Sequence, residues 1–269
     1  MFDISDILDL DRYPLHRPDS SDWAALVTRC KRDLASDGMF NLDGFLRPEV
    51  AASVTKQLAP IFETDSFRHE RSHNIYFKRD IDGLTPDHPA LMRFQTSNRT
   101  LCADQFADGP LITLYEWPEF ARFLAATMEM PRLHVMKDPL ARVNAMQYRS
   151  GQALNWHFDR SEFTTTLLLQ APDAGGEFEY RTGLRSEDDP NYDGVAAMLR
   201  GKDQNVKRMT LEAGTLNVFK GRNTAHRVTP IEGATARMIS VFSFYDRPGV
   251  VFSDEERIGF YGRAEPVQA

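Results

Sequence analysis

A histidine and an aspartate stand two positions apart in the segment Asn-Trp-His-Phe-Asp, as His157 and Asp159. Side chains two positions apart on a β-strand leave the same face, so these two could hold one metal ion together. A third ligand must come from elsewhere, and His226 begins a later predicted strand. Two histidines and one carboxylate leave the other coordination positions open, which suits iron(II) when it must bind a co-substrate and oxygen. The pattern predicts an iron(II) site.

Arg237 supports this prediction because it interrupts an otherwise apolar run, Ala-Thr-Ala-Arg-Met-Ile-Ser-Val-Phe. A cation among apolar neighbours is costly unless an anion accompanies it. A guanidinium group can bind a carboxylate through two hydrogen bonds, so a dicarboxylate co-substrate would supply that anion. Arg237 follows His226 closely enough for a hairpin to bring it back beside the metal. We therefore expect Arg237 to bind a co-substrate.

The order His157-x-Asp159, then His226, then Arg237 resembles that of the iron(II)/2-oxoglutarate oxygenase family. The segment from Tyr148 to Asp159 is similar to the Tyr-x-x-Gly-x-x-Leu-x-x-His-x-Asp arrangement of many members, and the likeness covers residues 140–247. The resemblance implies a double-stranded β-helix (jelly roll) that binds Fe(II), 2-oxoglutarate and O2. It also implies that Tyr148 lines the co-substrate pocket. Oxidative decarboxylation to succinate would then drive hydroxylation of a substrate.

One position departs from the family pattern. Many members have a serine two residues after the arginine, where it shares the carboxylate, whereas this chain has Ile239. Thr166 or Thr235 could replace it, although a threonine in a strand is more often simply a good strand former. The second partner of the carboxylate stays open.

The layout of the whole chain resembles one branch of the family, which contains radical halogenases and hydroxylases of free amino acids. The segments that carry this likeness are residues 156–159, 167–180, 214–230, 245–252 and 259–264. Halogenases of that branch have glycine in place of Asp159, because removing the carboxylate leaves a site for chloride. The resemblance therefore implies hydroxylation of a free amino acid or related small molecule at an unactivated C–H bond.

Three further residues are candidates for the site. Asn144 precedes Tyr148 by an even interval, so both could face the barrel interior and the co-substrate; a buried asparagine bound to backbone is the alternative. Arg93 lies among apolar residues and could bind a substrate carboxylate. Arg160 follows the predicted carboxylate ligand and could point to the mouth of the pocket, or it could be a solvated residue on the opposite face.

The expected architecture is mainly β with α. Helical spacing of apolar residues predicts helices over 21–37, 48–62 and 119–128, whereas 63–89 is polar and is interpreted as a long irregular loop. We expect a helical N-terminal region over 1–135, a β-helix core over 136–248 and a tail over 249–269. The expected core strands are rich in β-branched and aromatic residues and lie within 142–148, 162–170, 176–181, 208–213, 215–220, 226–231 and 237–245.

Composition limits the partners. The net charge of −7 argues against binding to nucleic acid or to an anionic membrane surface, and a small-molecule substrate fits better. The N-terminus carries acids where a secretory signal would carry bases, and no apolar run is long enough for a membrane span. Two cysteines, Cys30 and Cys102, do not suggest a disulfide framework, so a cytoplasmic location is expected. The sequence does not indicate an oligomeric state.

Two other functions have to be weighed. His69-Glu70-x-x-His73 has the form of a zinc metallopeptidase motif, which on a helix would present two ligands one turn apart. Its flanks lack a helical apolar stripe, so a polar loop is the simpler interpretation. Alternatively, the jelly roll could be a non-catalytic binding domain, but such a domain would not need the three metal ligands together with Arg237.

Overall fold

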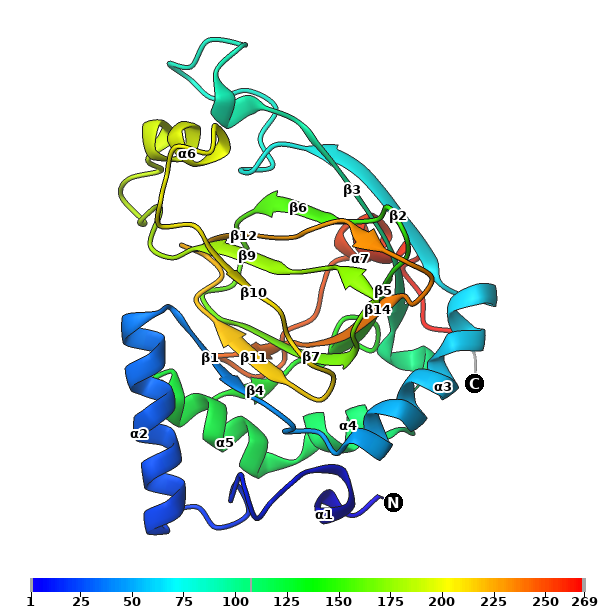
Figure 1. The fold of residues 1–269 in the computed structure, drawn as a ribbon. Helices are drawn as coiled ribbons and strands as arrows, with labels where there is room; N and C mark the ends of the chain where they lie inside the picture. Colours follow the sequence, from blue (N-terminus) through cyan, green and yellow to red (C-terminus); the bar gives the residue numbers. More distant parts are fainter. Residues whose placement is uncertain (1, 107, 268–269) are drawn as a thin grey trace.

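Two antiparallel sheets form the centre of the computed structural model, which describes residues 2–106 and 108–267 (Figure 1). The larger sheet has seven strands in the order β1-β11-β7-β14-β5-β3-β2, and the smaller has four in the order β10-β9-β12-β6. Four of the strands in the larger sheet and all four in the smaller come from residues 143–242, and they build the predicted jelly roll. The mainly β fold class with a jelly-roll core is therefore confirmed.

The strands of the large sheet are β1 (Met39–Leu42), β2 (Phe67–His73), β3 (Phe94–Cys102), β5 (Val143–Tyr148), β7 (Thr164–Gln170), β11 (Leu216–Phe219) and β14 (Arg237–Phe242). Those of the small sheet are β6 (Leu154–His157), β9 (Phe178–Arg181), β10 (Lys207–Met209) and β12 (Ala225–Val228). Two short ladders pair β8 (Ala174–Gly175) with β13 (Ile231–Glu232) and β4 (His134–Val135) with β15 (Phe244–Tyr245).

The helices α2 (Ser21–Ser36), α3 (Pro48–Thr64), α4 (Pro110–Glu116) and α5 (Pro118–Thr127) gather on one side of the sheets (Figure 1). Leu167 and Leu169 of β7 and Leu216 and Val218 of β11 belong to the same buried cluster as the apolar faces of these helices. Burying each such side chain contributes about 1.5–3 kcal/mol. The helices therefore hold the outer face of the large sheet, and its inner face is left to form the site.

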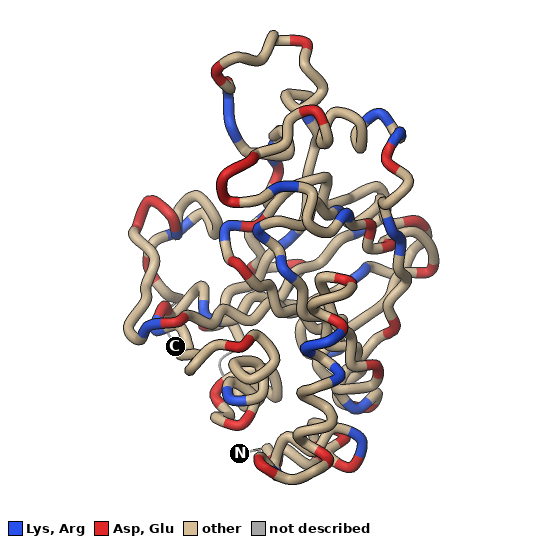
Figure 2. The backbone as a smooth tube through the Cα atoms, turned by 90° about the vertical axis from the view of Figure 1, so that its left-hand side faces the viewer, with Lys and Arg blue, Asp and Glu red and all other residues tan. Residues whose placement is uncertain are grey.

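The remaining helices are short: α1 (Ile4–Ile7), α6 (Tyr192–Leu199), α7 (Asp254–Tyr261) and the 3-10 turns η1 (Pro89–Leu91) and η2 (Ala103–Gln105). None of the described helices is both long and apolar enough to cross a membrane. Acidic and basic residues are interspersed along the chain (Figure 2).

The expectation for residues 63–89 is wrong in its first part, because residues 67–73 form β2. This strand pairs with β3, and β3 pairs with β5 of the jelly roll. The N-terminal region is therefore not only helical, since β1, β2 and β3 also extend the large sheet at its two edges (Figure 1). β2 escapes detection because both of its faces carry polar residues, so it lacks the alternation that identifies a half-buried strand.

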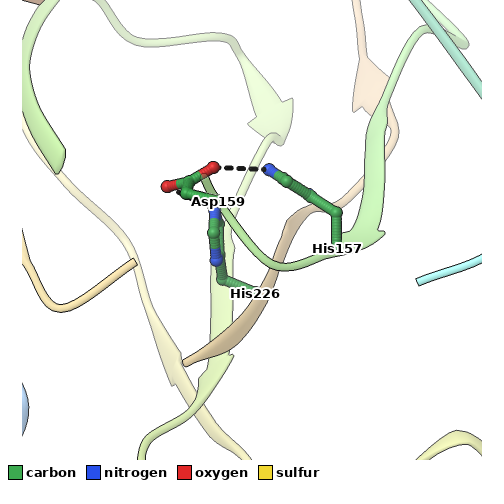
Figure 3. Close-up of side chains that lie close together, drawn as sticks. All are labelled: His157, Asp159 and His226. Carbon is green, nitrogen blue, oxygen red and sulfur yellow. Dashed lines mark ion pairs between the residues drawn. The ribbon is translucent and has the colours of Figure 1, made fainter. Parts of the chain in front are cut away.

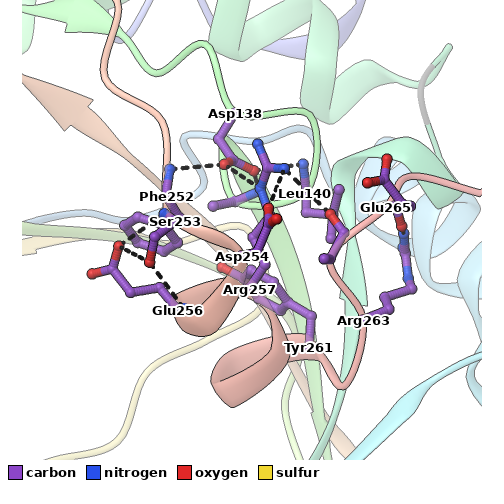
Figure 4. A network of polar contacts seen from close by, with 12 residues as sticks. Asp138, Leu140, Phe252, Ser253, Asp254, Glu256, Arg257, Tyr261, Arg263 and Glu265 are labelled. Atoms are coloured by element: carbon purple, nitrogen blue, oxygen red, sulfur yellow. Dashed lines mark hydrogen bonds and ion pairs between the residues drawn. The ribbon is translucent and has the colours of Figure 1, made fainter.

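Helix α7 is attached to the core through the fully buried carboxylate of Asp138 (Figure 4). Asp138 accepts hydrogen bonds at 2.9 Å from Arg257 Nε of α7 and from the backbone N–H groups of Leu140, Ala141 and Phe252. Burial alone would raise the pKa of Asp138, but these hydrogen bonds hold it below its ordinary value. The carboxylate therefore stays ionised and ties the C-terminal segment to the loop that precedes β5.

Replacing Asp138 by asparagine is expected to lower the free energy of unfolding by about 3–5 kcal/mol at neutral pH, because Arg257, which is 15% exposed, would then keep only its longer contact of 3.7 Å with the exposed Asp254. Since folding lowers the pKa of Asp138, its contribution is present above the unfolded pKa and is lost as the pH falls through the folded value. Urea unfolding of wild type and Asp138→Asn should therefore converge in acid. Asp246→Asn, in an exposed pair with Arg247, is the control and should behave as wild type. Equal stability of Asp138→Asn and this control at neutral pH would contradict the prediction.

Candidate metal centre

Antiparallel pairing of β6 with β12 sets His157 directly opposite His226. Asp159 follows the end of β6 and turns back between the two imidazoles (Figure 3). Its Oδ1 lies 3.4 Å from Nε2 of His157, and its Oδ2 lies 3.5 Å from Nε2 of His226. One ligand atom from each residue lies within 4.8 Å of the other two, and these residues form the only such group found in the described chain. The structure thus brings together the three predicted metal ligands.

The Nδ1 atoms of both histidines form hydrogen bonds that orient the rings. Nδ1 of His157 lies 2.8 Å from the backbone oxygen of Asn155, and Nδ1 of His226 lies 2.9 Å from that of Thr224. A carbonyl oxygen can only accept, so Nδ1 carries the proton and Nε2 presents a free lone pair to the centre. Burial and the neighbouring His226 lower the pKa of His157, which favours the neutral form that binds metal.

The Asp159 carboxylate is held by two residues that the sequence patterns did not single out. The hydroxyl of Thr164, at the start of β7, donates to Oδ2 of Asp159 at 2.5 Å. Gly221 accepts the backbone N–H of Asp159 at 3.1 Å, and a Cβ at Gly221 would lie only 2.4 Å from Oδ2. Burial would raise the pKa of Asp159, but the two histidines keep it well below its ordinary value. The carboxylate is therefore a fixed anion with one preferred position.

Replacing Thr164 by valine keeps the side-chain volume and removes the hydroxyl that orients Asp159. We expect the affinity for Co(II), used as an air-stable substitute for Fe(II), to fall by about 10–100-fold in calorimetric titrations. Thr164→Ser should restore most of the affinity. Thr165→Val, on the opposite face of the same strand, serves as the control. The prediction is wrong if Thr164→Val and Thr165→Val bind Co(II) equally well.

Arg237 begins β14 and stands opposite Tyr148 of β5. Its guanidinium carbon lies 6.0 Å from the centre of the Tyr148 ring, its side chain is 5% exposed, and its Nη1 has no hydrogen-bond partner among the described residues. Burial lowers the pKa of Arg237 to about 10, and no carboxylate lies within ion-pair distance in the described chain. A buried, uncompensated guanidinium of this kind fits an incoming carboxylate.

A cavity of about 310 Å³ reaches Arg237 and is also lined by Leu168, Gly176 and Phe178. A Cβ at Gly176 would approach Cδ of Arg237 to 3.2 Å, so glycine at this position leaves room beside the arginine. Tyr148 is fully buried, and its hydroxyl experiences the charges of both Arg237 and Asp159. Tyr148 is therefore near both Arg237 and Asp159, as expected for a residue beside a dicarboxylate that also binds a metal ion.

Asn144 is engaged elsewhere. Its amide donates to the backbone oxygen of Leu140 at 2.9 Å and accepts from the hydroxyl of Tyr261 at 3.0 Å. Asn144 is therefore the buried asparagine bound to backbone that was the alternative, and its hydrogen bond with Tyr261 helps to anchor α7. Thr235 lies in a turn where its N–H donates to Asp173, away from the interior, whereas Thr166 faces the interior beside Val241 of β14.

The two arginines expected at the substrate lie on the surface. Arg93 is exposed and donates to the hydroxyl and the backbone oxygen of Ser72. Arg160 has a side chain that is 79% exposed, and it pairs with Glu256 at 3.3 Å. The prediction that Arg93 lies in apolar surroundings is therefore wrong: its neighbours in the sequence are apolar, but its side chain is exposed. For Arg160, the solvated alternative agrees with its exposure.

The metallopeptidase interpretation of His69 and His73 is wrong because this segment is β2, not a helix. Glu70 is exposed and pairs with Arg68 on the opposite face from the histidines. Nε2 of His69 accepts from Arg71, and Nε2 of His73 lies 2.8 Å from the hydroxyl of Thr96. The two rings are thus engaged separately and do not converge on one ion.

A family model described as Halogenase D matches residues 22–250, and the chain therefore belongs to this family. No curated protein matches the sequence. The assignment agrees with the halogenase part of the resemblance seen in the sequence.

Solved structures of 2-oxoglutarate–iron(II) enzymes share the fold. The epimerase SnoN of nogalamycin biosynthesis, solved with Fe³⁺, α-ketoglutarate and nogalamycin RO, is 14% identical, with a TM-score of 0.56 over 83% of this chain and 84% of SnoN. The carbocyclase SnoK of the same biosynthesis is 14% identical, with a TM-score of 0.55 over 92% of this chain and 95% of SnoK. An oxidoreductase of the 2OG-Fe(II) oxygenase family from Burkholderia pseudomallei is 14% identical, with a TM-score of 0.51 over 83% and 92%. At these identities the likeness establishes the fold.

Proposed function

We propose that this chain is an iron(II)- and 2-oxoglutarate-dependent dioxygenase that hydroxylates a small molecule. Fe(II), 2-oxoglutarate and O2 are its cofactor and co-substrates. The observation that carries the proposal is the position of the Asp159 carboxylate, between the free Nε2 atoms of His157 and His226. Two neutral imidazoles and one carboxylate on one side of an ion leave its opposite side open for co-substrate and oxygen.

His157, Asp159 and His226 would hold the metal, and Arg237 would bind the distal carboxylate of 2-oxoglutarate with Tyr148 beside it. When bound, iron(II) with 2-oxoglutarate and O2 supplies the oxidising power needed to cleave an unactivated C–H bond. The protein positions the reactants and keeps water out of the site. The rings of Phe178 and Phe219 pack 5.7 Å and 4.8 Å from that of His226 and exclude water from that side of the site.

Halogenation is the second candidate, and the description of the matching family model as Halogenase D favours it. Against it stands Asp159, because its carboxylate takes the position beside the two histidines and repels an incoming anion. Thr164 and Gly221 hold the carboxylate at that position. We therefore favour hydroxylation, with a free amino acid as the substrate class that the resemblance implies.

Anaerobic addition of Fe(II) and then 2-oxoglutarate should produce a visible charge-transfer band. Arg237→Gln is expected to raise the 2-oxoglutarate concentration at which the band reaches half of its maximum intensity by about 10–100-fold. This factor corresponds to the loss of one or two charge-assisted hydrogen bonds. Arg247→Gln, an exposed arginine, is the control. A non-catalytic jelly roll would give no band, and absence of the band in iron-loaded protein would rule out the proposal.

Replacing Asp159 by glycine separates the two candidate reactions. We expect wild-type protein to give only hydroxylated product in the presence of chloride, detected by mass spectrometry. Asp159→Gly should lose hydroxylation, because the metal loses its anionic ligand, and Asp159→Glu should retain part of it. Chlorinated product from the wild type would favour halogenation, and undiminished hydroxylation by Asp159→Gly would show that Asp159 is not a ligand.

A further inference from the structure

The inner face of the large sheet becomes polar at its β2–β3 edge. The register pairs Thr100 of β3 with Met146 of β5, which packs against the interior cluster, so alternate residues of β3 continue the inner face. The interior side of an antiparallel sheet is normally apolar. Here it carries buried or half-buried polar groups on both strands: His69, Arg71, His73, Thr96, Asn98 and Thr100.

Arg71 is the cation of this face, and it forms no ion pair within the described part of the chain. Its Nε and Nη2 donate to Nε2 of His69 at 3.0 Å and 2.6 Å. Burial and the nearby Arg71 lower the pKa of His69 to about 4, so this ring is a neutral acceptor and brings no compensating charge. Among the described residues, no carboxylate lies within ion-pair distance of Arg71. By contrast, Arg68 of β2 pairs with Glu70, and Arg93, just before β3, donates to the backbone oxygen of Ser72.

Phe77 connects Arg71 to the metal centre. The Arg71 guanidinium carbon lies 5.2 Å from the centre of the Phe77 ring, which stacks on His73 at 4.4 Å and meets the ring of His157 edge-on at 6.1 Å. Arg71 is therefore separated from a metal ligand by a single aromatic ring. That distance suits a small substrate with an anionic group at one end and its reacting carbon at the other.

The turn that presents Phe77 is strained and firmly held. Phe77 has a φ of 55°, which is unfavourable for a bulky side chain, and it is 45% exposed. Asn74, which is 1% exposed, accepts the N–H groups of Tyr76 and Lys78 and donates to the backbone oxygen of Lys78. An exposed aromatic side chain fixed in a costly conformation beside a reactive centre is typical of a binding surface.

The charged side chains that lower the pKa values of Arg71 and His73 are cationic. Besides burial, Arg160 lowers the pKa of Arg71; besides burial and His157, Arg71 and Arg93 lower the pKa of His73. The nearby Glu256 pairs with Arg160. The charge at the inner face of β2 is thus positive, which attracts an anion and repels a cation.

We propose that Arg71 binds the carboxylate of the substrate, with the ring of Phe77 packing against the carbon chain that leads to the metal. The proposal rests on the proposed function and replaces Arg93 and Arg160 as the determinant of substrate binding. Arg71 is not a ligand of the metal or of 2-oxoglutarate. Its loss should therefore weaken substrate binding and leave the metal site intact.

The test uses the full chain loaded anaerobically with Fe(II) and 2-oxoglutarate. The probes are the proteinogenic L-amino acids and their carboxamides, which differ only in the carboxylate. Binding is measured as a change in the visible charge-transfer band, and turnover in air is measured as succinate. Arg71→Gln and Arg71→Lys are compared with Arg68→Gln, an exposed residue on the opposite face of the same strand.

We expect at least one acid, and not its amide, to alter the band and to stimulate succinate formation. Arg71→Gln should raise the KM for that acid by about 10–100-fold with a smaller change in kcat, Arg71→Lys should recover part of the loss, and Arg68→Gln should match wild type. Succinate formed without any probe should be the same in Arg68→Gln and in the wild type.

Three results would overturn the proposal: no acid alters the band, an amide binds as well as its acid, or Arg71→Gln behaves as Arg68→Gln does. In each case the charge-transfer band formed with Fe(II) and 2-oxoglutarate would persist, so the proposed function would stand. Failure of that band in the wild type would instead count against the proposed function itself.

Discussion

The pairing of β6 with β12 is the constraint on which the site depends. It sets His157 opposite His226, and the turn after β6 returns Asp159 between them. A shift of one residue in this register would send one histidine to the other face of the sheet and leave the ion with separated ligands. The register of this pairing shifts between His226 and Val228. Such irregularities redirect side chains and are common next to active sites.

Two arginines that pair with no carboxylate of the described residues make the interior of the jelly roll positively charged at two places. Arg237 is buried beside Tyr148, and Arg71 is half-buried beside Phe77. A desolvated cation is costly in the folded chain, so both positions reduce stability until an anion binds. The same cost favours anionic ligands, since an anion that binds beside the arginine replaces the favourable interactions with water that the guanidinium lost on folding. Positive charge at both places also fits substrates and co-substrates that are acids, and it excludes amines that lack a carboxylate.

The fold leaves the reaction open. Enzymes with this architecture include an epimerase and a carbocyclase, and the family to which this chain belongs is described by halogenation. Function lies in the site and not in the scaffold. In this chain the decisive group is one carboxylate, held by Thr164 and given space by Gly221. Thr164 and Gly221 lie beside Asp159 only in the folded chain, and they position a side chain there only because that side chain is a carboxylate.

The sequence alone identified the three candidate metal ligands that converge in the structure, Arg237, and most of the core strands, because these features are short-range or follow a family order. Two-residue spacing, an arginine in an apolar run and period-two patterns do not depend on distant parts of the chain. Only the tertiary structure decided the placement of β2, whose polar residues meet the interior because β3 pairs it to the sheet. Arg71, Phe77, Thr164 and Gly221 gained their roles in the same way. Strand pairing is a long-range interaction, so a local pattern could not distinguish these residues from an ordinary polar loop or turn.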